Sequence, residues 1–209
     1  MKRDASERTV VDLSELSTSN RYRFMISAIV PRPIAWVTST DRDGATNLAP
    51  FSFFQGVSAD PPTLMISVAA SKRSGERKDT LGNIEQTGEF VVNVVNEELL
   101  DPMILSSVEY GAATSEIEVT GLETFPSRHV TPPCLAASPV NMECRLLQRV
   151  DLGGCVVLFG EILLAHVLAG HLDEKGHVDP DRLRPVARLG GSRYALYGRS
   201  VSKTPPEKR

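Results

Sequence analysis

NLAPFSFF, at residues 47–54, is an apolar strand sequence that a proline interrupts. Pro50 has no N–H and a fixed φ, so we expect the strand to break there and leave neighbouring backbone groups facing a ligand. Asn47 and Ser52 add short hydrogen-bonding side chains, and the phenylalanines add apolar surface. The same stretch also fits an edge strand of an ordinary barrel. It therefore predicts β structure and marks a candidate binding segment.

Strand sequences continue on both sides of this stretch. Residues 33–40 form a strand that ends in the turn 41–44, where Gly44 is able to take a positive φ. Further strands are expected at 46–49, 52–58, 63–68, 89–95, 140–150 and 155–167, the last two joined by a hairpin, and helices at 21–28, 81–86 and 97–106. Long strands with few helices predict a mainly β fold, an antiparallel barrel that is closed or nearly closed.

The composition excludes several classes of protein. With 209 residues, 41% of them hydrophobic, we expect one domain at 13–198 and flexible termini at 1–12 and 199–209. A net charge of −3 gives no basic surface for nucleic acid or an anionic membrane. The start of the chain lacks the apolar core of a secretory signal, which indicates a cytoplasmic protein. Three cysteines and four histidines without ligand spacing predict no metal site.

A second candidate segment, SKRSGERKDT, occupies residues 71–80. It combines hydroxyl groups, cations and the start of a helix, and each of these favours a bound anion. We expect Asp79 to cap the helix and Lys78 and Thr80 to lie nearer to the ligand, with Ser71 and Arg73 beside them. Taken alone, the segment also fits a solvated charged loop.

Several motifs occur together in one order along the chain: PRPIAWVT (31–38), NLAPFSFF (47–54), DPP (60–62), KDTLGN (78–83) and EFVVN (89–93). In this order and spacing they resemble the flavin reductase-like family of FMN-binding split barrels, its flavoredoxin-like members in particular. The resemblance covers residues 20–170 and implies an antiparallel FMN-binding split barrel with a few flanking α-helices. It also implies a homodimer with the flavin near the subunit interface.

The resemblance implies FMN as the cofactor, with FAD as the less favoured alternative. The residues expected to bind it are Trp36, Thr38, Asn47, Leu48, Ala49, Pro50, Phe51, Ser52, Ser71, Arg73, Lys78 and Thr80. Trp36 also fits a role as a core or interface anchor. A flavin carries the redox chemistry itself, so the chain has only to bind it and position the electron donor.

The reaction implied is reduction of bound flavin by NADH or NADPH, with electrons passed to free flavin, a monooxygenase or another acceptor protein. His166, Arg193 and Tyr194 are candidates for side chains that assist, although His166 also fits a structural role. Two alternatives stay open. One is a flavoredoxin-like electron carrier without direct NAD(P)H activity, and the other is a non-catalytic barrel that binds another small ligand.

Overall fold

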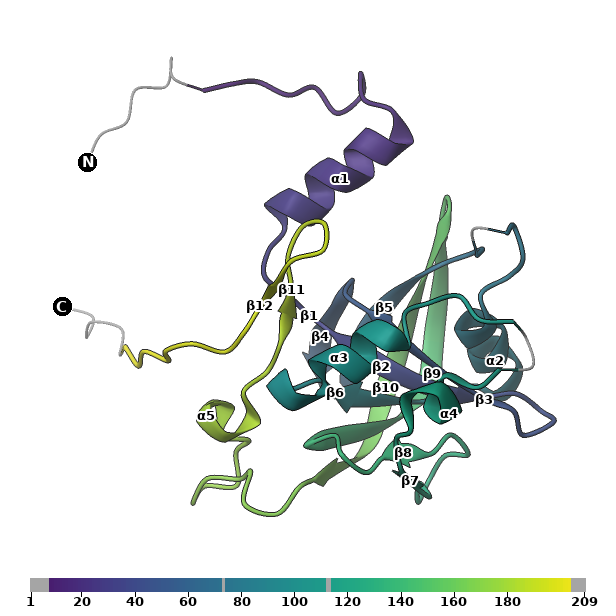
Figure 1. Cartoon of the computed structure of the whole chain (residues 1–209), viewed down its shortest axis with the longest axis vertical. Helices are drawn as coiled ribbons and strands as arrows, with labels where there is room; N and C mark the ends of the chain where they lie inside the picture. Colours follow the sequence, from purple (N-terminus) through teal and green to yellow (C-terminus); the bar gives the residue numbers. More distant parts are fainter. Residues whose placement is uncertain (1–7, 73, 112–113, 204–209) are drawn as a thin grey trace.

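The structure is a computed structural model that describes residues 8–72, 74–111 and 114–203 (Figure 1). Its main sheet has seven strands in the order β3-β2-β6-β9-β10-β5-β4, and every neighbouring pair is antiparallel. The strands are β2 (Ala35–Thr40), β3 (Thr46–Phe51), β4 (Phe54–Ala59), β5 (Pro62–Ala69), β6 (Glu89–Val94), β9 (Val140–Leu152) and β10 (Cys155–Val167). The mainly β, antiparallel architecture expected from the sequence is confirmed.

The two edge strands of the sheet, β3 and β4, are consecutive in the chain and meet at one corner of the barrel. Ser52 and Phe53 alone separate the end of β3 from the start of β4. At this corner the carbonyl of Phe53 accepts a hydrogen bond of 2.9 Å from the N–H of Ser67 on β5. The expected break at Pro50 is wrong: Pro50 lies within β3, opposite Trp36, and the strand ends after Phe51. An edge strand such as β3 tolerates a proline.

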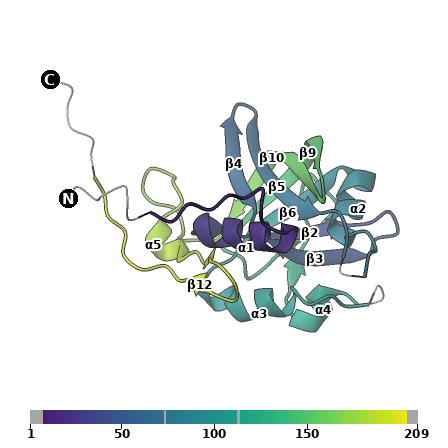
Figure 2. The same ribbon diagram turned by 90° about the horizontal axis from the view of Figure 1, so that it is seen from above.

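Helices lie outside the barrel. They are α1 (Thr18–Ala28), α2 (Asp79–Thr87), α3 (Leu100–Leu105), which follows the 3-10 turn η2 (Glu97–Leu99), α4 (Glu116–Thr120) and α5 (Pro180–Leu183). Viewed from above, α3 and α4 lie on one side of the sheet (Figure 2). None of the helices in the described ranges has the length and apolar character that a membrane-spanning helix needs.

Helix α1 stands on the outside of the molecule and buries none of its residues (Figure 1). The Ser17 side chain caps it by accepting from the N–H of Asn20. The C-terminal part of the chain returns to this region in a small sheet, β1-β11-β12, made of Arg32–Pro33, Ala187–Arg188 and Tyr194–Ala195. The turn between β11 and β12 reaches the end of α1, where a Cβ on Gly190 would lie 3.3 Å from Ser27.

Three apolar clusters form the core of the described residues, and β2 contributes to the two larger ones. Ala35 and Val37 face the cluster inside the barrel, whereas Trp36 faces a second cluster under α3. Successive side chains of a strand point to opposite faces, so a strand that is buried on both faces has no polar side. Inside the barrel Phe90 lies against Gly160, where a Cβ would come within 2.4 Å of the ring.

Candidate functional site

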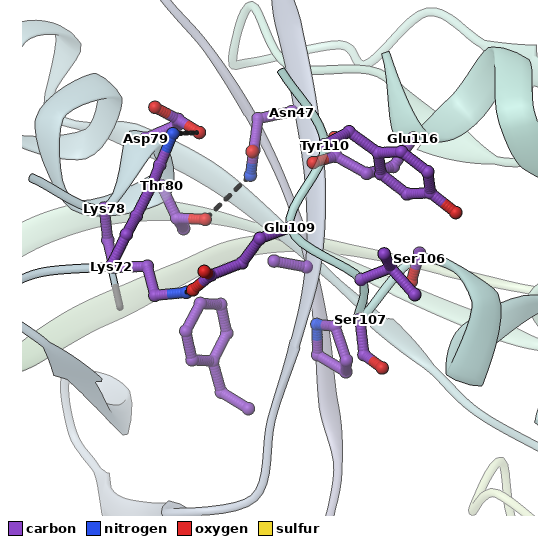
Figure 3. A pocket seen from close by; sticks show the side chains of 14 residues that line it. Asn47, Lys72, Lys78, Asp79, Thr80, Ser106, Ser107, Glu109, Tyr110 and Glu116 are labelled. Carbon is purple, nitrogen blue, oxygen red and sulfur yellow. Dashed lines mark hydrogen bonds and ion pairs between the residues drawn. The ribbon is translucent and has the colours of Figure 1, made fainter. Parts of the chain in front are cut away.

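A hollow lies beside β3 and the start of α2, and a hydrogen bond joins these two elements at its wall. The side-chain amide of Asn47 donates to the hydroxyl of Thr80 at 2.7 Å (Figure 3). Residues from three segments line the hollow: Asn47, Ala49, Pro50 and Phe51; Lys72, Lys78, Asp79 and Thr80; and Ser106, Ser107, Val108, Glu109, Tyr110 and Glu116. The two segments marked in the sequence, 47–54 and 71–80, therefore lie side by side.

One end of the hollow carries two lysines, and each of them is paired with a carboxylate. Lys72 lies 2.7 Å from the carboxylate of Asp79, and Lys78 lies 2.8 Å from that of Glu109. The hydrogen bond to Asp79 is the main reason that the pKa of Lys72 is raised, which keeps this ammonium group charged. The expected cap by Asp79 is wrong, because Lys78 is the N-cap residue and no side chain caps α2.

These groups fit a phosphate group. The uncapped first turn of α2 presents backbone N–H groups, and a helix N-terminus attracts negative charge. Because the oxygen of Thr80 accepts from Asn47, the hydroxyl proton is available to donate to another acceptor. The ammonium groups of Lys72 and Lys78 add charge-assisted donors. A phosphate oxygen can replace the carboxylate that each of them now contacts.

A second hollow adjoins the first and shares Pro50, Phe51 and Ser107 with it. Its other lining residues are Tyr22, Ile34, Ser52, Met103, Arg188 and Tyr194. Its lining combines aromatic and apolar side chains with the polar groups of Ser52, Ser107 and Arg188, so it offers ring faces beside hydrogen-bond donors. The two hollows share part of their walls, so one molecule with a phosphate at one end and a planar ring at the other can reach both.

One backbone N–H group beside the first hollow already has a hydrogen-bond partner. The N–H of Leu48 donates to a carboxylate oxygen of Glu116 at 3.0 Å, and the Leu48 side chain is fully buried. Burial raises the pKa of Glu116, although the bond from Leu48 opposes that shift. Leu48 is therefore part of the core beneath the hollow, and Glu116 is a lining residue that its sequence context did not mark.

Three other residues selected from the sequence lie away from the two hollows. Trp36 is fully buried and donates from Nε1 to the hydroxyl of Ser106 at 2.9 Å. Thr38 is also fully buried and donates to the carbonyl of Pro133 at 2.6 Å. Ser71 is exposed and pairs with Arg77 in an isolated β-bridge. Arg73 lies outside the described residues.

His166 belongs to a different cluster. Its Nε2 lies 2.6 Å from the carboxylate of Glu143, and its ring meets Phe125 edge-on. The Cys134 thiol completes a group of three potential metal ligands whose atoms all lie within 4.8 Å of one another. Backbone N–H groups already donate to both Glu143 oxygens, and burial raises the pKa of the Cys134 thiol, so this arrangement favours a structural hydrogen-bond cluster.

The C-terminal return contributes one expected residue and one that the sequence did not mark. Tyr194 lines the second hollow, whereas Arg193 is exposed on the turn beside it. Arg188 takes the place expected for Arg193, with its guanidinium 4.4 Å from the centre of the Tyr194 ring. Arg188 lies on β11, whereas Arg193 lies in the turn before β12, and two-residue strands have no pattern from which to predict this difference.

Comparisons with known proteins agree with this geometry. A family model described as a flavin reductase like domain matches residues 26–186. Nitrilotriacetate monooxygenase component B from Bacillus cereus is 33% identical, with a TM-score of 0.88 over 94% of this chain and 98% of that one. The 2-nitrobenzoate 2-nitroreductase NbaA from Pseudomonas fluorescens is also 33% identical, with a TM-score of 0.87 over 95% of this chain and 97% of that one.

A third structure has the same fold at lower identity. It is a protein from Shewanella frigidimarina assigned as a flavin reductase with a split barrel domain. It is 26% identical, with a TM-score of 0.81 over 93% of this chain and 96% of that one. The main sheet, whose edges meet at Ser52 and Phe53, is thus a flavin reductase-like split barrel.

Proposed function

Because the chain belongs to the flavin reductase-like family, we propose that it binds FMN across the two adjoining hollows and catalyses reduction of the flavin by NADH or NADPH. The observation that carries this proposal is the contact between Asn47 and Thr80. It joins the two segments that a flavin nucleotide would need, one for its ring and one for its phosphate. The family membership supports a flavin, and the polarity of the site supports its orientation.

In this proposal Lys72, Lys78 and Thr80 hold the phosphate at the start of α2. The carboxylates of Asp79 and Glu109 exchange their present partners for solvent or for other donors when the phosphate binds. An exchange of this kind costs least at the pair of Lys78 and Glu109, which is the more exposed of the two, because exposed ion pairs contribute about 0–1 kcal/mol. The dianionic phosphate is then the better partner for the two ammonium groups.

The ring would occupy the second hollow, between Pro50 and Phe51 on one side and Tyr194 on the other. Bound FMN supplies the group that accepts hydride and returns electrons singly or in pairs. The residues of the chain bind it, cover part of its surface and leave one face open to the electron donor. The described residues supply the walls of this site from β3, α3 and the C-terminal return.

Similarity to one component of a monooxygenase supports a proposal for the electron acceptor. The protein is similar to nitrilotriacetate monooxygenase component B over nearly its whole length. We therefore propose that the reduced flavin serves a partner oxygenase or another acceptor. A flavoredoxin-like carrier would bind the same flavin but would need another protein to reduce it.

We also propose that the protein is a homodimer. The face formed by α1 and the neighbouring edge of the barrel is an apolar groove lined by Met25, Ile29, Pro31, Phe53, Phe54 and Met65 among others. The exposed fractions of Tyr22 and Ile29 on α1 are 56% and 55%. A second copy of the chain on this face would cover these side chains and lie next to Tyr22, which lines the ring end of the site.

The proposal is tested by absorption spectroscopy and steady-state kinetics on one preparation. Bound flavin gives two bands in the violet and blue that dithionite bleaches. Oxidation of NADH or NADPH in the presence of excess FMN then measures turnover. Turnover with either nicotinamide supports the reductase, whereas flavin binding without turnover favours the carrier. A protein that neither retains nor binds FMN contradicts the proposal.

A further inference from the structure

Two arginines face each other on neighbouring strands beside the second hollow. Arg32 of β1 and Arg188 of β11 are directly opposite in the strand register. Like charges directly opposite on paired strands destabilise a sheet. The sequence retains this pair although one neutral residue at either position would relieve the repulsion.

Arg32 is a buried cation without a carboxylate partner. Its side chain is only 5% exposed and donates to the carbonyls of Ile26, Ile29 and Leu189 at 2.7, 2.6 and 3.2 Å. Burial lowers the pKa of Arg32, and the charge of Arg188 lowers it further. These carbonyls orient the guanidinium, but they do not neutralise it.

Arg188 is held in place by groups that carry no charge. It donates to the carbonyl of Gly191 at 2.6 Å, and its guanidinium stacks on Tyr194. Among the residues that the structure describes, no Asp or Glu forms an ion pair with Arg32 or Arg188. Two positive charges therefore adjoin the second hollow, and no carboxylate among the described residues pairs with either of them.

We propose that Arg188, oriented by Tyr194, binds the anionic group of a planar substrate at the ring end of the site. The proposal rests on the function proposed above and names its substrate class: a conjugated ring that carries a carboxylate or a phosphate. Arg188 lines the hollow, whereas the buried Arg32 raises the positive potential behind it and holds Ser52 by a bond of 3.4 Å. A guanidinium supplies paired donors that match such oxygens.

Ligand binding tests this proposal without requiring turnover. Benzoate and benzamide have the same ring and differ in charge, so their dissociation constants from the FMN-loaded protein isolate the anionic group. We expect benzoate to bind about tenfold more tightly than benzamide, as a charge-assisted bond requires. Arg188→Gln should remove this preference, Arg188→Lys should keep part of it, and Arg193→Gln, on the exposed turn, should leave it unchanged.

A second arm identifies the source of the anion. NADH is compared with a benzyl dihydronicotinamide that lacks the phosphates. A KM that rises in Arg188→Gln for NADH alone assigns the anion to the donor, whereas a lost benzoate preference assigns it to an aromatic acid.

The proposal is overturned if the unaltered protein does not distinguish benzoate from benzamide and Arg188→Gln leaves both KM values unchanged. It is also overturned if Arg188→Gln weakens only FMN binding. An FMN titration of each variant separates these results from a failure of the flavin site itself.

Discussion

Asn47 donates a hydrogen bond of 2.7 Å to Thr80, 33 positions later in the chain, and so ties the edge strand β3 to the first turn of α2. Thr80 is almost fully buried, which fixes its side chain in this direction. The hydroxyl accepts from Asn47 and has its proton left to donate into the hollow. The contact therefore does more than hold two elements together, since it orients a donor at the end of the site that carries Lys72 and Lys78.

Thr80→Val tests that donor, because valine keeps the shape of threonine and removes the hydroxyl. We expect the FMN dissociation constant to rise by about tenfold or more, since a hydrogen bond to a charged group contributes about 1.5–3 kcal/mol. Fluorescence quenching of FMN measures the change. Thr87→Val, at the other end of α2, should leave FMN affinity within about twofold while perturbing the helix to a similar degree.

The two lysines allow a sharper test of the phosphate position. Lys72→Ala with Lys78→Ala should weaken FMN binding by at least about tenfold, because both charge-assisted donors are lost. Binding of riboflavin, which has the same ring and no phosphate, should change little. Lys175→Ala, an exposed lysine far along the chain, serves as the control. Equal losses for FMN and riboflavin would contradict the assignment of this end to the phosphate.

The sequence predicted the long strands well because each strand carries its own signal. The second long strand was expected at 155–167, and β10 spans Cys155–Val167. The family resemblance also implied that residues of 47–54 and 71–80 bind one ligand, and the two segments lie side by side. Which side of a strand faces the ligand was not predictable for β2, because all six of its residues are buried and their alternation carries no polarity.

The rest of the site depends on contacts between distant parts of the chain. Lys72 lines the hollow but was not among the residues predicted to bind the ligand. The sequence of a loop that contains several cations does not indicate which of them the fold directs towards a ligand. Ser107 and Tyr110 lie in a segment with weak patterning, and Arg188 reaches the site only through the pairing of β1 with β11. Such long-range pairings leave no local trace in a single sequence.

The apolar face of α1 predicts the oligomeric state. Met25 and Ile29 are one helical turn apart and line the same groove. Light scattering should give twice the chain mass of 22.8 kDa for the unaltered protein, and Met25→Asp with Ile29→Asp should shift it towards the monomer. A buried carboxylate without a partner is costly in an interface. Leu168→Asp, at another exposed apolar position, should leave the dimer intact, and a monomeric unaltered protein would contradict the proposal.

Glu143 predicts how stability depends on pH. Burial alone would raise its pKa, but hydrogen bonds from the N–H groups of Arg128 and His129 and from His166 outweigh burial and leave the pKa lowered. A carboxyl group whose pKa is lower in the folded state stabilises the protein above its unfolded pKa, about 4.3, and loses that contribution as the pH falls through the folded value.

Glu143→Gln should therefore lower the free energy of unfolding at pH 7 by about 1–3 kcal/mol, because its amide nitrogen would face a backbone donor in a site with no exposed surface. The difference from the unaltered protein should shrink as the pH falls below the unfolded value and through the lowered pKa of Glu143. Urea unfolding at several pH values measures both effects.

Glu118→Gln removes the same charge from an exposed position and should change stability by no more than about 0.5 kcal/mol at any pH. A stability difference for Glu143→Gln that stays constant down to pH 3 would show that packing, and not the charge of this carboxylate, holds the loop that contains Arg128 and His129.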